Sequence, residues 1–262
     1  MGRRRAAPEV IAAAGELRVL RDRERPSGRL LRQGEMDASY VDLADARHLE
    51  FDYLRRMRDV VLLTGARRVV HVGGAGCALA RALAAEEPAH RQEVIELDGG
   101  VVELARRHLG LRRASGLRVR VGDGRTVLAR RPDGSADAVL VDAFVGARVP
   151  RHLVTVEALA DLARIARLAA INVVDSRAMT DAAAIAAGLR TAFAYVCVIG
   201  AAQVLAKRRS GNVVVVGAQD PPPLDRLRAS AAADPSPGTL LEPDEIDAFI
   251  GGAPPWNDFQ IP

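Results

Sequence analysis

The chain has 262 residues, of which 49% are hydrophobic, and this suits one α/β domain with an N-terminal attachment. The formal net charge is +4, but the arginines are scattered and interleaved with Asp and Glu, and aromatic residues make up only 3%, which argues against nucleic-acid binding. No apolar run approaches the roughly 18–20 residues of a membrane span. The basic start is not followed by the apolar segment of a secretory signal, so we expect a cytoplasmic protein with no membrane partner.

The two ends of the chain are predicted to lie outside the main fold. Residues 1–15 are basic and rich in Ala, and we expect a flexible tail there. Residues 221–262 are rich in Pro, Ala, Asp and Gly. They are expected to form a C-terminal tail with two short helices, near Asp225–Ala232 and Pro243–Ile250.

Residues 16–63 are predicted to form a β-hairpin and a linking helix. Two alternating runs, Glu16–Asp22 and Arg29–Gln33, are separated by turn-forming residues and read as the hairpin. Another extended run follows at Met36–Val41. A helix is expected from about Ala46 to Leu63, capped by Asp45. Its apolar positions recur at helical spacing, at Leu49, Tyr53, Leu54 and Met57.

Strand and helix patterns alternate over residues 64–220, as expected for a mostly parallel sheet with helices on both faces. The predicted helices are Cys77–Ala85, Val101–Leu109, Arg125–Arg130, Val154–Arg167 and Thr180–Ala192. The predicted strands are Arg68–Val72, Glu93–Leu97, Leu117–Val121, Ala136–Val141, Ala169–Val174, Tyr195–Ile199 and Asn212–Gly217. The last two are consecutive, which predicts a seven-stranded sheet closed by an antiparallel pair, unlike a dinucleotide-binding Rossmann domain.

Small and acidic residues follow each of the first four predicted strands. Because ligands bind beyond the carboxyl ends of parallel strands, we expect these residues to form one site. They are Gly73, Gly74 and Gly76 after the first strand, Glu96 after the second, Asp123 and Gly124 after the third, and Asp142 and Ala143 after the fourth.

Their types and positions predict an adenosyl ligand. The glycines let backbone approach a ligand, and Glu96, 20 residues beyond Gly76, can accept hydrogen bonds from ribose hydroxyls. Asp123 can accept the exocyclic amine of adenine, and Asp142 faces the sulfur end. Structural alternatives stay open, namely a plain tight turn at the glycines and helix-capping roles for the carboxylates. NAD would call for glycine at position 79, where Leu79 stands.

Several segments resemble the spermidine synthases, which are polyamine aminopropyltransferases of the class I S-adenosylmethionine-dependent methyltransferase superfamily. The segments are 40–43, 93–106, 121–125 and 172–175. The likeness covers roughly residues 16–220 and is to a divergent, actinobacterial-type member of the family. It implies a Rossmann-like class I methyltransferase fold, a homodimer, and aminopropyl transfer from decarboxylated S-adenosylmethionine to a small-molecule amine.

Carried over by position, the resemblance implies that Glu96 holds the ribose and Asp123 the adenine, with the three glycines around the methionine-derived part. Asp142 matches the first aspartate of the family's D-S-[ST]-D-P loop, which receives the attacking amine. Several positions depart from the family pattern. Two family aspartates fall on Ala75 and Val145, a proline on Gly146, a glutamine on Asp37, and a tyrosine-glutamine pair nearest to His48 and Leu49.

These departures leave three hypotheses open. The first is aminopropyl transfer, which needs Asp142 and a replacement carboxylate such as Asp37, Glu50 or Asp175 beside an apolar pocket around Phe144. The second is methyl transfer from intact S-adenosylmethionine to a small molecule. The third is a non-catalytic protein that binds the nucleoside. Neither the scattered histidines nor the two cysteines have metal-ligand spacing, so we expect no metal and no disulfide.

Overall fold

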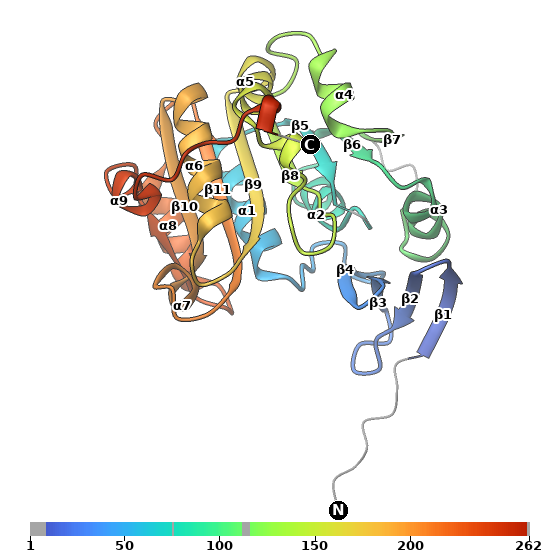
Figure 1. Cartoon of the computed structure of the whole chain (residues 1–262). Coiled ribbons are helices and arrows are strands. Elements are labelled where there is room, and N and C mark those ends of the chain that lie inside the picture. Colours follow the sequence, from blue (N-terminus) through green and yellow to red (C-terminus); the bar gives the residue numbers. More distant parts are fainter. Residues whose placement is uncertain (1–8, 75, 112–115, 261–262) are drawn as a thin grey trace, which may run out of the picture.

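The computed structural model describes residues 9–74, 76–111 and 116–260, and their elements form two sheets (Figure 1). The smaller is an antiparallel four-stranded sheet in the order β1-β2-β3-β4. Its strands are β1 (Glu9–Ala14), β2 (Leu17–Arg21), β3 (Gly28–Gln33) and β4 (Met36–Asp42). The predicted hairpin is confirmed, because β2 pairs with β3 from Leu17↔Gln33 to Arg21↔Arg29.

The larger sheet has eight strands in the order β12-β10-β11-β9-β8-β5-β6-β7. Strands β5 to β9 pair in parallel, and β11 and β12 are antiparallel to their neighbours. The strands are β5 (Arg68–Gly73), β6 (Arg91–Glu96), β7 (Leu117–Val121), β8 (Ala138–Asp142), β9 (Leu168–Asp175), β10 (Tyr195–Ala201), β11 (Gly211–Ala218) and β12 (Gly238–Leu241).

Helices cover both faces of this sheet, and an apolar cluster lies between the sheet and the helices on each face. One cluster takes residues from α1 (Asp52–Thr64), α2 (Ala78–Glu86), α3 (Gly99–His108) and α8 (Leu224–Ala233). The other takes residues from α4 (Gly124–Ala129), α5 (Val156–Ile165), α6 (Thr180–Ala192), α7 (Ala202–Leu205) and α9 (Ile246–Ile250). Two short 3-10 turns, η1 (Arg151–Leu153) and η2 (Asp258–Gln260), complete the described elements. No helix of the described residues is both long and apolar enough to cross a bilayer.

The expectations for the chain ends need correction. Residues 9–14 of the expected flexible tail form β1, which pairs with β2 and takes the N-terminal sheet beyond a hairpin. Residues 1–8 lie outside the described part. The two helices expected in the C-terminal tail are confirmed as α8 and α9, but β12 between them pairs with β10. The sheet therefore has an eighth strand, and residues 224–250 contribute elements to the main fold.

The linking helix α1 begins later than predicted. Its N-cap is Phe51, and no side chain caps it. The Asp45 carboxylate instead accepts the Arg47 N–H at 3.0 Å, in a local turn before the helix. The later start places Tyr53 in the first turn, close to the carboxyl edge of the sheet.

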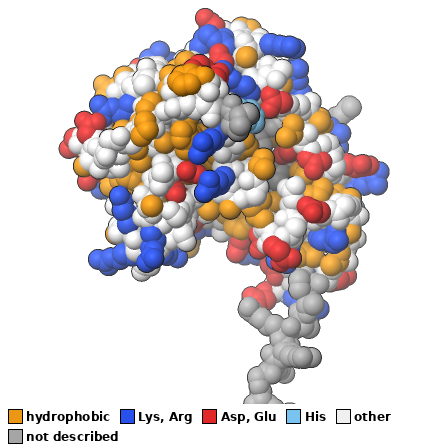
Figure 2. Space-filling model, viewed as in Figure 1, with side chains coloured by type: hydrophobic (Ala, Val, Ile, Leu, Met, Phe, Trp, Pro, Cys, Tyr) orange, Lys and Arg blue, Asp and Glu red, His pale blue; other side chains and the backbone are white. Residues whose placement is uncertain are grey.

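Charged side chains of both signs are interspersed over the face seen in Figure 2. The same view shows a hollow between the N-terminal sheet and the body of the molecule. Several arginines are held in ion pairs, such as Arg125 with Asp161 at 2.8 Å and Arg55 with Asp234 at 2.6 Å. This pattern agrees with the solvated, mixed-charge surface expected from the sequence.

Candidate active site

The ends of the four parallel strands β5 to β8 lie along one edge of the large sheet. In the β5–β8 pair Gly73 lies opposite Asp142, and in the β6–β7 pair Glu96 lies opposite Val121, two residues before Asp123. The structure thus brings the residues predicted from the four strand ends to one edge. The hydrogen bonds that each side chain already makes decide whether it can also contact a ligand.

The glycine loop after β5 has two glycines with positive φ, Gly73 at 77° and Gly74 at 97°. A Cβ on Gly73 would lie 2.5 Å from the carbonyl oxygen of Asp142, and one on Gly76 would lie 2.7 Å from Ser39 Oγ. A Cβ on Gly74 would meet nothing within 4 Å. Close packing therefore explains Gly73 and Gly76, and Gly74 leaves open space for a ligand. Ala75 lies outside the described residues.

Glu96, the last residue of β6, and Asp98, two residues further along the chain, have different contacts. Asp98 is the N-cap of α3, and its carboxylate accepts the Gly100 N–H at 2.7 Å. Glu96 is partly exposed at the end of β6, and its Oε1 accepts the Asp98 N–H at 3.0 Å. Asp98 is thus the residue that caps α3, and Glu96, which does not cap that helix, remains the candidate for the ribose hydroxyls.

Asp123 is the N-cap of α4, which is the helix-capping role that the sequence left open as an alternative. Its Oδ1 accepts from the backbone N–H and hydroxyl of Thr126 at 2.8 and 2.7 Å, and its Oδ2 lies 3.2 Å from Nε2 of His152. Burial acts to raise the pKa of Asp123, but these bonds outweigh it and the pKa is lowered. Oδ2 can still accept an adenine amine beside His152, a neighbour that the sequence did not single out. Gly124 packs tightly, since a Cβ there would lie 2.5 Å from Val72.

Asp142 is held by side chains from two other elements, β9 and α1. Its Oδ1 accepts from Asn172 Nδ2 at 2.8 Å, and its Oδ2 lies 3.5 Å from the hydroxyl of Tyr53. Asn172 in turn accepts from Asn212 Nδ2 at 3.0 Å. Burial raises the pKa of Asp142 to about 6, against the hydrogen bonds from Asn172 and Tyr53 and together with the charge of Glu96. The carboxylate is thus oriented and poised to take up a proton near neutral pH.

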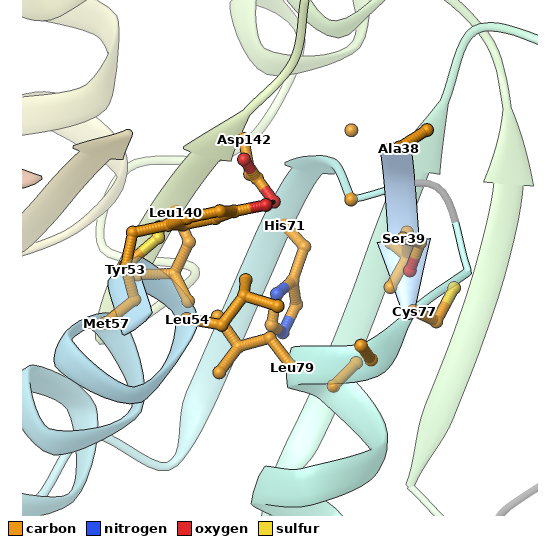
Figure 3. Close-up of a pocket in the computed structure, with 15 residues that line it drawn as sticks. Ala38, Ser39, Tyr53, Leu54, Met57, His71, Cys77, Leu79, Leu140 and Asp142 are labelled. Atoms are coloured by element: carbon orange, nitrogen blue, oxygen red, sulfur yellow. Dashed lines mark hydrogen bonds between the residues drawn. The ribbon is translucent and has the colours of Figure 1, made fainter. Parts of the chain in front are cut away.

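Asp142 and Tyr53 border a pocket between the N-terminal sheet, α1 and the glycine loop (Figure 3). Its walls are mostly apolar, and Asp142 is the one carboxylate among the described residues that line it. The lining residues are Ala38, Ser39, Tyr53, Leu54, Met57, His71, Gly73, Gly74, Cys77, Ala78, Leu79, Ala80, Val94, Leu140 and Asp142.

The three carboxylates expected to replace the missing aspartates are not among the described residues that line this pocket. Asp37 is exposed and pairs with Arg32 at 2.7 Å, because it lies one residue before the pocket-lining part of β4. Glu50 is exposed and lies 3.0 Å from His48. Asp175 is buried, and its two oxygens accept from the backbone N–H groups of residues 176 and 182 at 2.7 and 2.8 Å.

The loop after β8 turns away from the pocket. Val145 is 71% exposed and pairs with Arg148 across a tight turn in which Gly146 has a φ of 59°. Phe144 is partly buried against the apolar cluster on the opposite face of the sheet, so the expected Phe144 wall is also not found. Ala143 packs there too, beside Gly73.

Tyr53 is the residue that the sequence reading missed as part of the site. The positions nearest to the family's tyrosine-glutamine pair were His48 and Leu49, but His48 pairs with Glu50 and Leu49 is buried in the core. The Tyr53 hydroxyl reaches Asp142 instead, and its ring stacks on Phe51 with centroids 5.8 Å apart. A tyrosine in the first turn of the linking helix was the available signal.

Neither cysteine shows signs of reactivity. Cys77 and Cys197 are both buried, neither is in a disulfide, and burial raises the pKa of each thiol to about 12. Within residues 9–74, 76–111 and 116–260 there is no group of three His, Cys, Asp or Glu side chains that could hold a metal ion.

Comparisons with known proteins point to one family. No family model matches the chain. A polyamine aminopropyltransferase from Vibrio vulnificus (strain CMCP6) is 30% identical over 123 residues, which are 46% of this chain and 41% of that protein. The match therefore spans less than half the length of this curated relative.

Solved structures extend the likeness over nearly the whole chain. A probable spermidine synthase from Corynebacterium glutamicum superposes with a TM-score of 0.88 and 25% identity, over 96% of this chain and 97% of that one. Spermidine synthase from Thermotoga maritima superposes with a TM-score of 0.63 and 14% identity, over 86% of this chain and 78% of that one. Human methyltransferase-like protein 13, in complex with SAH, superposes with a TM-score of 0.51 and 17% identity, over 80% of this chain and 93% of that one. The last two show the fold alone. The chain is thus similar to spermidine synthases in sequence and structure, and it has a class I methyltransferase-like fold.

Proposed function

We propose that the chain is a transferase that moves an aminopropyl group from decarboxylated S-adenosylmethionine to a small-molecule amine. The observation that carries the proposal is the setting of Asp142, at a strand end beside the glycine loop, with its carboxylate oriented by Asn172 and Tyr53. Homology to spermidine synthases supports a transferase of this kind.

The reaction makes one bond and breaks one. The nitrogen of the acceptor attacks the aminopropyl carbon next to the sulfonium, a new N–C bond forms, and the C–S bond breaks to leave neutral 5′-methylthioadenosine. The attacking nitrogen must lose a proton. An alkylamine has a pKa of roughly 10 and is mostly protonated near neutral pH, so a nearby base is needed. With a pKa of about 6, Asp142 is mostly ionised above neutral pH and can accept that proton.

Other residues are proposed to hold the nucleoside. Glu96 accepts the ribose hydroxyls, and Asp123 accepts the adenine amine through Oδ2, beside His152. Gly74 borders the chain attached to sulfur, where its missing side chain leaves space. Gly73 and Gly76 contribute by letting the loop pack against Asp142 and Ser39.

Methyl transfer from intact S-adenosylmethionine is the second candidate. Asp142 is the sole carboxylate among the described residues that line a mostly apolar pocket, and a polyamine acceptor has a second positive charge to neutralise. This pocket therefore suits a less charged acceptor, or a ligand that keeps its own carboxylate, better than a pocket with several aspartates would.

We also propose a cytoplasmic homodimer. The support is the N-terminal sheet, whose outer strand β1 is largely exposed, with Val10 at 54%. Exposed edge strands favour pairing with another copy. Light scattering after size exclusion tests this, since a mass of one chain, 27.9 kDa, at micromolar concentration would contradict it.

Calorimetric titration tests the choice of ligand. The purified protein is titrated separately with S-adenosylmethionine and its decarboxylated form, and both titrations are repeated on Glu96→Ala. We expect tighter binding of the decarboxylated form, and a loss of roughly 10- to 100-fold with both ligands in the variant. Preference for the intact form would favour methyl transfer. No binding of either by the folded protein would refute the adenosyl site.

A further inference from the structure

His71 is a buried histidine that lines the pocket and has no role in the proposed chemistry so far. It lies in the middle of β5 and is 6% exposed. Its Nε2 is 2.9 Å from Oε1 of Gln92 on the neighbouring strand β6. A histidine that only fills the core would not need to face a pocket, and His71 does.

The hydrogen bonds of Gln92 fix which nitrogen of His71 carries the proton. Gln92 Nε2 donates to the carbonyl oxygen of Ala80 at 2.8 Å, so its Oε1 must face His71. That oxygen can only accept, and His71 Nε2 is therefore the N–H donor. Burial lowers the pKa of His71 to about 4, so the ring is neutral and Nδ1 has a free lone pair. Among the described residues no group donates to Nδ1.

Asp142 and His71 face the same pocket at different depths. In the β5–β8 pair His71 lies opposite Leu140 and Gly73 opposite Asp142, so both side chains leave the same face of the sheet. One step of two residues along a strand is about 7 Å, and neighbouring strands are about 5 Å apart. Figure 3 shows the His71 ring deeper than Asp142, in the space that Tyr53, Leu54 and Leu79 also border.

This spacing and polarity fit a short alkyl chain with an amine at its far end. The walls between the two polar groups are apolar, and the deep end offers a lone hydrogen-bond acceptor, which matches an N–H donor and not a carboxylate. We propose that His71 Nδ1 binds the terminal primary amine of a ligand whose reacting end lies at Asp142. The inference rests on the proposed function, and it names the residue that selects an amine over a carboxylate.

Two ligands could bring that amine, namely the aminopropyl chain of decarboxylated S-adenosylmethionine and the far end of a diamine acceptor. Paired titrations separate them. Decarboxylated S-adenosylmethionine is compared with 5′-methylthioadenosine, which lacks the aminopropyl chain. With 5′-methylthioadenosine saturating, 1,4-diaminobutane is compared with n-butylamine, which lacks the second amine. Each affinity ratio isolates the amine from the rest of the ligand.

The variant is His71→Leu, accompanied by a double variant His71→Leu/Gln92→Leu that leaves no unpaired glutamine. We expect one of the two affinity ratios to fall roughly tenfold in both variants, the size of one lost hydrogen bond in a buried site. In that pair, the affinity for the ligand that lacks the amine, 5′-methylthioadenosine or n-butylamine, should change less than twofold. Val94→Ala, another lining change, is the matched control and should affect both ligands of a pair alike.

Either ratio falling supports the inference and assigns the source of the amine. Equal losses for both ligands of each pair, or no loss in variants that melt cooperatively, would overturn it and leave His71 as a structural residue. If the unchanged protein binds neither adenosyl ligand, the proposed function itself fails, and that result is distinct from the others.

Discussion

Asp142→Asn is predicted to stabilise the fold while it abolishes transfer. The aspartate is costly to the folded chain because burial holds its pKa at about 6, against 3.8 for an ordinary aspartate. An asparagine has the same shape and no charge to desolvate. Its oxygen can accept from Asn172 and its amide can donate to the Tyr53 oxygen, so neither partner loses its contact.

The sign and size follow from proton linkage. Between pH 4 and 6 the folded protein holds a proton on Asp142 that the unfolded chain has released, so stability falls as pH rises through this window. A shift of about 2 pH units is at most about 3 kcal/mol, and partial exposure of the site reduces it to about 1–3 kcal/mol. Asp142→Asn should therefore be more stable than the unchanged protein by this amount at pH 8 and no more stable at pH 4.

Urea unfolding at the two pH values measures this difference, because the contributions of all other carboxylates cancel between the two proteins. Transfer activity at pH 8 should fall by roughly 100-fold or more, as expected when a general base is lost. A stability difference that is independent of pH would refute the burial argument. Retained activity would refute the role of Asp142.

Three further outcomes are expected. Asn172→Leu removes a donor to Asp142, which raises its pKa, so the acid limb of the pH–rate profile should move up from about 6 by up to about 1 unit; an unmoved limb would contradict this. Glu96→Ala should weaken the binding of 5′-methylthioadenosine by roughly 10-fold or more in titration, and an unchanged affinity would show that Glu96 does not bind the ribose. Asp37→Asn should change turnover less than twofold, because Asp37 pairs with Arg32 outside the pocket; a large loss would return it to the site.

The strand ends that build the site were predictable from the sequence. Short apolar runs that end in glycine or aspartate carry a local signal, and parallel pairing brings them to one edge whatever the loops do. The helix-capping role of Asp123 was also open as an alternative from the sequence, since an N-cap depends on residues a few positions away. The structure shows that a cap and a ligand contact are compatible, as at Asp123.

Contacts across the sheet were not predictable. Tyr53 meets Asp142 across 89 positions of sequence, and Asn172 meets Asn212 across 40. Such pairs depend on strand register and helix placement, which no local pattern encodes. The strand β12 was missed because it has four residues and lies between Pro-rich and helical segments. The surroundings of the three candidate carboxylates also depend on tertiary contacts, as at Asp37, which is exposed and pairs with Arg32.

The most direct test of the account is product analysis. The protein is incubated with decarboxylated S-adenosylmethionine and a panel of primary amines and diamines, and 5′-methylthioadenosine is quantified, with Asp142→Asn as the control. The account predicts 5′-methylthioadenosine together with an equal amount of aminopropylated amine, and neither product from the control. S-adenosylhomocysteine formed from intact S-adenosylmethionine, with no 5′-methylthioadenosine from the decarboxylated form, would contradict it.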